Sequence, residues 1–338
     1  MHTRLAKMAL LTVTALLCAP AEGEIRVARQ GHIAPGKKET LDPNLINDPR
    51  MQQTIGQNSV GSAVVRAQIL LNRAHFSCGE IDGEYGINLQ KTVAAFQHSQ
   101  SVPAEGIVGP ATWEVLNADS APALTTYTIA KEDLAGPFGA VPADAMEQAK
   151  LKYLGYESPL AGLAEKFHSS PKLLQALNPG KSFNQAGEQI LAPNVITMPP
   201  GKAASVVVSK SDSSVSAYDA NGKLLVYDRA TIGSKHDPLP IGDWKILGVA
   251  RYPVFHYNAG LFWNAHDPNE KAEIAPGPRN PVGVVWIDLS KEHYGIHGTP
   301  DPSGIGHTLS HGCIRLTNWD AWELAGMVKP GTLATLED

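Results

Sequence analysis

Cysteine, clustered positive charge and long apolar runs are all scarce in this chain. Only 3 of the 338 residues are cysteine, which excludes a small fold held together by disulfides. The formal net charge is −5 and no long basic run is present, so nothing indicates nucleic-acid binding. Hydrophobic residues make up 43% of the chain, which is enough for folded cores and argues against disorder. The length allows two or three domains.

The apolar stretch at the N-terminus is too short for a comfortable transmembrane helix. Positive charges at Arg4 and Lys7 precede the apolar residues Met8–Leu17, and Ala19–Ala21 follows as a small-x-small cleavage site. This order is typical of an export signal. We therefore predict a signal peptide over residues 1–21 and no stable membrane anchor after its removal, with a retained anchor as the alternative.

Removal of Cys18 with the signal leaves Cys78 and Cys313 in the exported protein. Two cysteines in an oxidising compartment could form a disulfide. We expect no such bond, because it would block the thiol chemistry that the surroundings of Cys313 indicate. Cys78 is then a small buried residue of another domain. Residues 22–51 are rich in proline, glycine and charge without clear periodicity, so we predict a flexible leader there.

Residues 52–118 have the apolar spacing of a small helical unit. Apolar residues repeat at helical spacing over Val60–Ala74 and over Leu89–Phe96, and Gly109–Trp113 opens a third helix. The runs that carry a family resemblance are, in order, Ile81–Gly86, Val93–Gln97 and Gly106–Trp113. Together they resemble the three-helix peptidoglycan-binding domain of cell-wall enzymes. The resemblance implies targeting to the wall, and a spacer of the same fold without binding is the alternative.

Residues 125–199 follow the order strand, helix, helix, strand. The expected elements are, in order, Tyr127–Ile129, Leu160–Phe167, Ser170–Leu177 and Gly187–Asn194. Ser170 and Pro171 form an N-cap and first-turn pair for the second helix. The order resembles a LysM glycan-binding module and departs from it by a long insertion, Ala130–Pro159. Both a working glycan binder and a degenerate structural linker remain open.

Residues 203–338 change to short strands separated by turn signals. The expected strands are Ser205–Val208, Val215–Tyr218, Lys223–Tyr227, Pro240–Ile246 and Val282–Leu289. Asp219–Gly222 has the composition of a hairpin turn, and Thr317 and Asp320 resemble a capping box before a helix over Ala321–Val328. We predict a multidomain chain whose last domain is a mainly β sandwich or barrel with a late helix.

The segment Ser310–Leu316 is the most informative part of the sequence, because it places His311, Cys313 and Arg315 two residues apart. In an extended strand these side chains share one face. His297 would come from the preceding strand, and Gly295, Gly298 and Gly312 would leave room for close backbone approach. An imidazole near a thiol can take its proton and stabilise the thiolate, which is the reactive form of cysteine. The segment therefore predicts a cysteine nucleophile.

Two other interpretations of the same residues are open. One is a zinc site built from His297, His311 and Cys313, since zinc accepts such ligands. The other is a buried thiol with core histidines. The mature chain has no second cysteine near Cys313 and no His-Glu-x-x-His pair, which favours the nucleophile.

Three runs in this domain also carry a family resemblance, namely His297–Pro300, Ser310–Leu316 and Asn318–Ala321. They resemble the signature of the YkuD-type L,D-transpeptidase catalytic domain over residues 203–338. The resemblance implies a thioester on the cysteine and no metal or organic cofactor. The implied catalytic residues are Cys313 as nucleophile, His297 as general base, Gly298 through the carbonyl that holds His297, His311 as support and Gly312 in the oxyanion hole. The implied substrate contacts are Arg315, Ser310 and Thr299, with a structural ion pair as the alternative for Arg315.

The resemblance also implies a substrate, the stem peptides and glycan of peptidoglycan, and a location, the periplasm. The thiol would attack the third residue of a tetrapeptide stem, release D-Ala, and pass the acyl group to an amine in a 3→3 cross-link. A lipoprotein lysine or water are alternative acceptors, and a non-enzymatic wall-binding protein is the alternative class. Gly248–Pro281 is long for a connection, so we expect either a lid or a surface excursion with its own small core.

Overall fold

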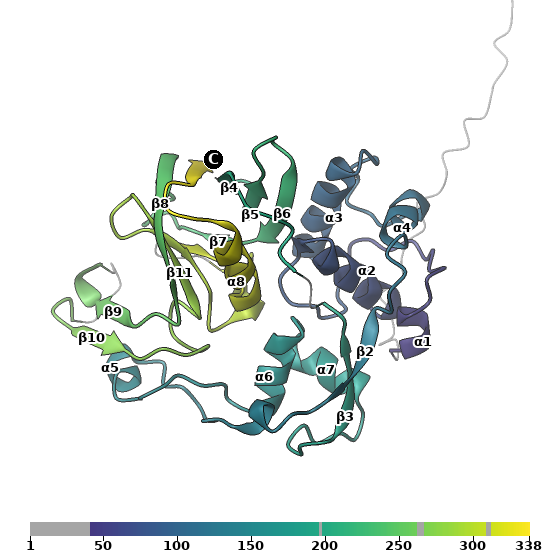
Figure 1. The fold of residues 1–338 in the computed structure, drawn as a ribbon, viewed down its shortest axis with the longest axis horizontal. Helices are drawn as coiled ribbons and strands as arrows, with labels where there is room; N and C mark the ends of the chain where they lie inside the picture. Colours follow the sequence, from purple (N-terminus) through teal and green to yellow (C-terminus); the bar gives the residue numbers. More distant parts are fainter. Residues whose placement is uncertain (1–40, 196–197, 262–266, 309–311) are drawn as a thin grey trace, which may run out of the picture. The chain divides into compact units, whose positions relative to one another are not determined.

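The computed structural model describes residues 41–195, 198–261, 267–308 and 312–338 (Figure 1). The predicted signal peptide and most of the predicted leader lie outside these residues. The flexible leader is wrong for residues 41–51, because Pro43–Ile46 forms helix α1, capped by the Asp42 side chain. Ile46 is fully buried and its carbonyl accepts a hydrogen bond from the Arg66 guanidinium at 2.9 Å. These contacts fix the end of the leader.

The helical unit, residues 52–118, contains α2 (Ser62–Arg73), α3 (Ile87–Ser99) and α4 (Pro110–Leu116). The helices predicted there are present, and most of their buried apolar residues form one core that includes Trp113, while Val65 and Ile69 of α2 pack in a second cluster with Leu173 and Leu177. Val60 does not continue the first stripe, because it precedes α2 and is exposed. A short strand, β1 (Phe76–Ser77), lies between α2 and α3.

The middle module, residues 125–199, has the predicted order of strand, helix, helix and strand. Its elements are β2 (Leu124–Thr128), α6 (Pro159–Lys166), α7 (Pro171–Leu177) and β3 (Gln189–Pro193). β2 and β3 pair antiparallel, and Ser170 caps α7 by accepting a hydrogen bond from the Leu173 N–H. The insertion adds a 3₁₀ turn, Glu132–Leu134, and the short helix α5 (Ala145–Gln148). The assignment to LysM stays a prediction.

The C-terminal domain, residues 203–338, is built on a large mixed sheet, which confirms the mainly β prediction. Within the described residues the sheet has ten strands in the order β1-β6-β5-β4-β14-β8-β11-β12-β13-β7. The strands not yet given are β4 (Ser205–Ser209), β5 (Ser214–Tyr218), β6 (Leu224–Arg229), β7 (Thr231–Ile232), β8 (Gly242–Arg251), β11 (Val285–Leu289), β12 (Gly295–His297), β13 (Ile314–Arg315) and β14 (Leu333–Glu337). The late helix is α8 (Asn318–Met327).

The long strand β8 connects the two halves of the sheet. Its first residues pair with β14 and the residues after Lys245 pair with β11, both antiparallel. The buried residues of both halves and of α8 belong to one apolar core, which includes Val206, Ile287 and Leu324. The predicted cap of α8 is present, because the Thr317 hydroxyl accepts the Asp320 N–H at 3.1 Å. The core therefore fixes β12, β13 and the start of α8, on which the candidate site is built.

Strand β1 belongs to the helical unit in sequence and to the C-terminal sheet in space, which the sequence did not predict. It pairs in parallel with β6, with Ser77 opposite Asp228. The Ser77 hydroxyl also donates to Asp320 Oδ2 at 2.8 Å. The helical unit is thus joined to the C-terminal domain by both backbone and side-chain hydrogen bonds.

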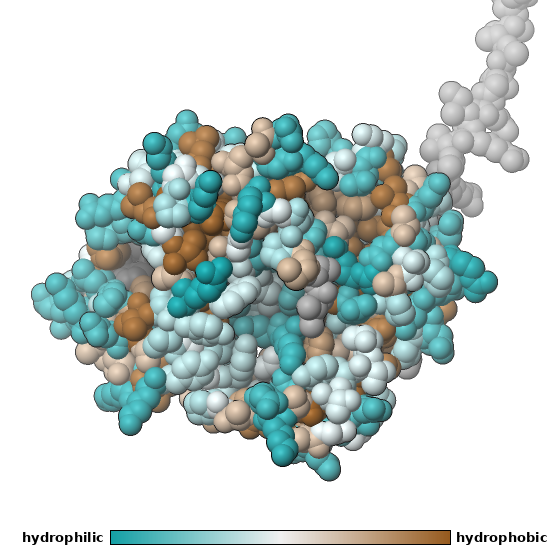
Figure 2. All heavy atoms as spheres, viewed as in Figure 1, coloured by the Kyte–Doolittle hydropathy of each residue, from teal (hydrophilic) through white to brown (hydrophobic). Residues whose placement is uncertain are grey.

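The described residues contain no helix long and apolar enough to cross a membrane. On the face drawn in Figure 2, hydrophobic residues lie in small separate patches among hydrophilic ones.

Candidate functional site

His297 ends strand β12 and is buried, with 3% of its surface exposed. Its Nδ1 lies 2.6 Å from the Gly298 carbonyl oxygen. A carbonyl can only accept, so Nδ1 carries the proton and Nε2 keeps its lone pair. Burial, together with the positive charge of Arg315, lowers the pKa of His297 to about 3. The ring is therefore neutral at physiological pH, in the tautomer that can accept a proton at Nε2.

The ring of His297 is also held from one side by Trp286 of β11. The two residues are paired across β11 and β12, and their rings stack with centroids 5.4 Å apart and planes 19° apart. Gly295 makes this arrangement possible, because a Cβ there would lie 2.6 Å from the Trp286 ring. The imidazole can therefore change its orientation only if β11 or the Gly298 loop moves.

Gly298 is packed against the side chain of Asn318, the first residue of α8. A Cβ at position 298 would overlap Asn318 Oδ1. The Asn318 amide is buried and accepts the Val284 N–H at 3.1 Å, while its Nδ2 donates to Glu165 Oε1 at 3.0 Å and to the Pro278 carbonyl at 3.1 Å. The carbonyl that holds His297 thus lies in a tightly packed, hydrogen-bonded loop.

Cys313 precedes strand β13, which runs parallel to β12 and places Arg315 opposite His297. Among the described residues of Ser310–Leu316, Ile314–Arg315 is strand, and Gly312 has a φ of 97°, so the extended conformation considered for this run does not hold at Gly312. A side chain at position 312 would also contact the Tyr294 ring at 2.9 Å. Glycine is therefore required there both by backbone conformation and by space.

The Cys313 thiol is partly buried and donates to the His293 carbonyl oxygen at 3.7 Å. Burial raises its pKa, and a hydrogen bond from the Gly295 N–H and the charge of Arg315 oppose the increase without cancelling it. No disulfide joins Cys313 to Cys78, which is buried as predicted. The resting site therefore holds a neutral thiol beside a neutral imidazole.

Arg315 lies in β13 between His297 of β12 and Thr231 of β7. Burial lowers the pKa of the guanidinium, and its Nε is buried without a hydrogen-bond partner in the part of the chain that the structure describes. Within those same residues Arg315 makes no ion pair with a carboxylate. The structural ion pair is thus not seen among these residues, and the contact to a substrate carboxylate stays a prediction.

The other predicted residues are distributed as follows. Thr299 is buried, and its hydroxyl accepts the Asp301 N–H at 3.2 Å in a local turn. Ser310 and His311 lie outside the described residues. His311 is one of the three ligands of the zinc alternative, so that site cannot be described in full. Elsewhere, the described ranges contain no group of three or more His, Cys, Asp or Glu placed to hold a metal.

The segment Asp301–Thr308 before the cysteine is held by the helical unit. Asn88 of α3 donates to the Ile305 carbonyl at 2.8 Å, and its side chain lies against Gly306, where a Cβ would overlap it. Thr231 of β7 contacts the same segment through Gly304 and Gly306. Nothing in the sequence connected Asn88 to the site, because it comes from a different domain.

The segment Gly248–Pro281, predicted to be a lid or a surface excursion with its own small core, contains regular strands among its described residues. It begins with the end of β8 and contains an antiparallel pair, β9 (Phe255–Asn258) and β10 (Lys271–Ile274). Its end is tied to the insertion of the middle module, because Leu154 exchanges backbone hydrogen bonds with Pro276 and Arg279. Whether it closes over the site stays a prediction.

Sequence reasoning missed Trp286, Asn88 and Glu165. Trp286 stood in the strand expected over Val282–Leu289, but nothing in the sequence placed it against His297. Tyr294 stood in a predicted strand, but its contact with Gly312 depends on the turn that carries His293 in a left-handed conformation with φ 68°.

Two family models match the chain. The L,D-transpeptidase catalytic domain, YkuD, matches residues 203–336, and a model described as a "Putative peptidoglycan binding domain" matches residues 60–116. The chain is 31% identical over 179 residues to the "Putative L,D-transpeptidase YkuD" of Bacillus licheniformis, covering 52% of this chain and 92% of that protein. It is 27% identical over 184 residues to the "Probable L,D-transpeptidase YbiS" of Escherichia coli, covering 53% of this chain and 60% of that protein.

Among solved structures, L,D-transpeptidase 3 from Mycobacterium tuberculosis is similar with a TM-score of 0.33 and 18% identity. The similarity covers 44% of this chain and 66% of that one.

Proposed function

We propose that this chain, which belongs to the YkuD-type L,D-transpeptidase family, cross-links peptidoglycan stem peptides through a thioester on Cys313. The observation that carries the proposal is the orientation of His297. Its Nδ1–H is held by the Gly298 carbonyl, so Nε2 is the basic nitrogen, and its strand lies beside the one that Cys313 precedes. These are the features that activation of a thiol by a base requires.

In the first half of the reaction, the Cys313 sulfur attacks the carbonyl carbon of the third stem residue. The thiol proton passes to Nε2 of His297, and a tetrahedral oxyanion forms. The carbon–nitrogen bond to D-Ala then breaks, and the leaving amine takes the proton from the imidazolium. The products are a thioester on Cys313 and free D-Ala, with His297 again neutral.

In the second half, an amine of another stem attacks the thioester carbonyl and gives up a proton to Nε2. The carbon–sulfur bond breaks, the proton returns to sulfur, and a 3→3 peptide bond remains. Backbone N–H groups near Gly312 and Cys313 would stabilise both oxyanions, and one such donor is typically worth about 10²–10³ in rate. Arg315 would bind a carboxylate of the stem, since its Nε is buried without a hydrogen-bond partner among the described residues.

The thiol of Cys313 and the imidazole of His297 are both neutral before substrate binds, and this determines how the thiolate forms. Because the pKa of Cys313 is raised and that of His297 is lowered, proton transfer is unfavourable until the substrate carbonyl is in place. The thiolate is therefore generated during attack rather than stored. This would protect the cysteine of an exported enzyme from oxidants.

The family match to a peptidoglycan-binding domain supports peptidoglycan as the partner of the helical unit. A periplasmic location follows from the predicted export signal and the wall substrate. A wall-linked lipoprotein is a second candidate acceptor, because its lysine supplies the same amine chemistry as a stem.

The test is incubation of the mature protein with purified tetrapeptide muropeptides, followed by mass spectrometry, with Cys313→Ala as control. We expect a dimer linked between two third residues, formed by the wild type and absent from the variant. Tripeptide without dimer would instead indicate water or a missing acceptor such as lipoprotein. Turnover that survives Cys313→Ala would exclude this cysteine as nucleophile, and no product at all would favour a binding protein.

A further inference from the structure

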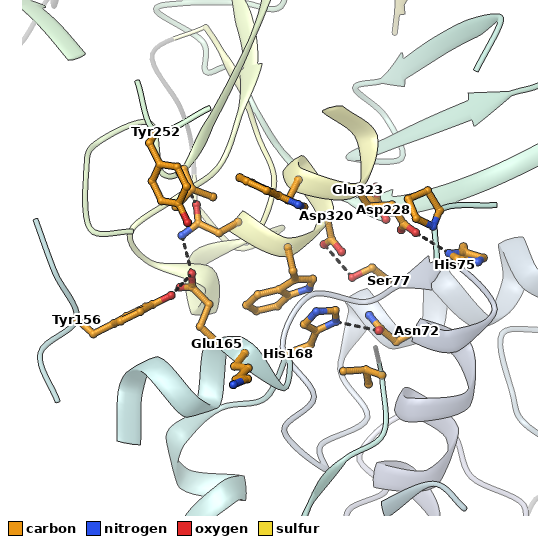
Figure 3. Close-up of a pocket in the computed structure, with 17 residues that line it drawn as sticks. Asn72, His75, Ser77, Tyr156, Glu165, His168, Asp228, Tyr252, Asp320 and Glu323 are labelled. Atoms are coloured by element: carbon orange, nitrogen blue, oxygen red, sulfur yellow. Dashed lines mark hydrogen bonds and ion pairs between the residues drawn. The ribbon is translucent and has the colours of Figure 1, made fainter. Parts of the chain in front are cut away.

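Glu165 belongs to the middle module, outside the residues that the catalytic-domain model matches, yet it reaches the surroundings of His297. It lies in α6, and its Oε1 accepts two hydrogen bonds, from the Tyr156 hydroxyl at 2.9 Å and from Asn318 Nδ2 at 3.0 Å. Figure 3 shows Glu165 between Tyr156 and the start of α8, at one end of a cavity of about 390 Å³. Burial raises the pKa of this carboxyl to about 7.

The Asn318 amide can serve the site in only one orientation. Its oxygen must face the Val284 N–H, which donates to it at 3.1 Å. The flipped amide would place its NH₂ group against that N–H, and two donors would then face each other without an acceptor. Two acceptors keep the NH₂ group on the opposite side, the Pro278 carbonyl and Glu165. Glu165 is the only one of the two that comes from outside the C-terminal domain.

The oriented amide then sets the position of Gly298. Asn318 Oδ1 lies so close to this residue that a Cβ would overlap it, and the Gly298 N–H donates to the Val285 carbonyl at 3.1 Å on its other side. The Gly298 carbonyl is directed at His297 Nδ1 between these two restraints. An unbroken series of contacts therefore runs from Glu165 through Asn318 and Gly298 to His297.

We propose that Glu165 is a positioning residue for the catalytic base, through the Asn318 amide that it holds in place. The proposal rests on the proposed function in one respect, that His297 is the base. It makes the middle module a necessary part of the active enzyme rather than only a linker or a glycan binder. Glu165 itself does not contact the reacting atoms.

The experiment compares three variants of the full mature chain. Glu165→Ala removes the acceptor, Glu165→Gln keeps an accepting oxygen without the charge, and Glu147→Ala removes an exposed glutamate of the same module that pairs with Lys150 within the insertion. The first readout is the NMR resonance of the His297 Nδ1 proton without substrate, assigned with His297→Gln. The second is kcat and KM for cross-linking.

For Glu165→Ala we expect the Nδ1 proton resonance to shift and broaden, kcat to fall by roughly tenfold and KM to stay within about twofold, because orientation rather than binding is lost. Glu165→Gln should restore both readouts, and Glu147→Ala should leave both unchanged. If Glu165→Ala does not fold, Glu165→Met, which fills the volume without an accepting oxygen, takes its place.

A folded Glu165→Ala or Glu165→Met protein with the wild-type resonance and kcat would overturn the proposal. A Glu165→Gln protein that behaves like Glu165→Ala would also overturn it, since an accepting oxygen at this position would then not be enough to orient Asn318. Failure of the proposed function is distinguishable, because the resonance is measured without substrate: it would still respond to Glu165→Ala in a protein that shows no turnover.

Discussion

At the scale of single residues, Gly298 shows how closely the site is packed. The residue offers a carbonyl to His297 on one side and lies against Asn318 on the other. No other amino acid fits between them without displacement of α8 or of the loop. The candidate base is thus oriented by a main-chain atom whose position depends on the absence of a side chain.

Gly298→Ala should therefore lower both activity and stability. The added methyl overlaps Asn318 Oδ1, and relief of such overpacking typically costs about 1–3 kcal/mol. Displacement of the carbonyl should also reduce kcat by at least roughly tenfold. Urea denaturation and muropeptide turnover measure the two effects. Gly248→Ala is the matched control, since no atom lies within 4 Å of a Cβ there; equal behaviour of the two variants would contradict the packing argument.

Cys313 allows a second prediction, on pH dependence. Its pKa is raised above the ordinary value of 9.0, so the thiol is protonated at neutral pH and the thiolate fraction grows as pH rises. The rate of alkylation by iodoacetamide should therefore increase continuously through neutral pH and beyond pH 9. Mass spectrometry of the modified peptide gives the rate, with Cys313→Ala reporting any reaction at Cys78. A rate that is already constant through neutral pH would indicate a stored thiolate–imidazolium pair instead.

Cys313 and His297 could be picked out from the sequence alone, because few residue types can supply a thiolate and its base. Trp286 could not be found in this way. A tryptophan in a strand is ordinarily a core residue, and only the register of β11 against β12 stacks this one on His297.

At the scale of elements, local signals were reliable where backbone hydrogen bonds are local. The caps of α7 and α8 and the turn between β5 and β6 are as predicted, with Asp219 accepting the Asn221 and Lys223 N–H groups. The conformation around Cys313 was harder to predict. The sequence allowed an extended run through position 312, but Gly312 has a positive φ of 97°, and the described strand begins at Ile314.

The cap of α8 gives the prediction at this scale. Thr317 is fully buried, and its hydroxyl accepts the Asp320 N–H at the start of the helix that carries Asn318. Thr317→Ala should destabilise the protein by about 1–2 kcal/mol, the usual cost of a lost N-cap. Thr317→Ser keeps the hydroxyl and should lose clearly less. Urea denaturation distinguishes the variants, and an equal loss in both would mean that the methyl group rather than the cap stabilises the helix.

At the scale of the whole molecule, the helical unit and the C-terminal domain are not independent. β1 extends the C-terminal sheet, and Asn88 of α3 holds the segment that leads to the cysteine. A domain that could have served only to bind the wall thus contributes directly to the position of the segment that leads to Cys313.

Asn88→Ala should then lower activity without loss of wall binding. The Ile305 carbonyl loses its donor and the Asp301–Thr308 segment gains freedom, so kcat should fall by roughly tenfold. Sacculus pull-down measures binding and muropeptide turnover measures kcat. Asn184→Ala, in an exposed loop of the middle module, is the control. Wild-type turnover in a folded Asn88→Ala protein would show that the segment needs no support from α3.

The sequence by itself predicted the chemistry, a thiol nucleophile with its imidazole, and determined the parts: three helices, a strand–helix–helix–strand module and a mainly β domain. These follow from residue types and from periodicities that act over a few residues. Only the tertiary structure decided how the parts support one another. The contacts of Glu165 with Asn318, of Asn88 with Ile305 and of β1 with β6 join residues far apart in the chain, and such pairs leave no periodic signal because they depend on how separately formed elements pack.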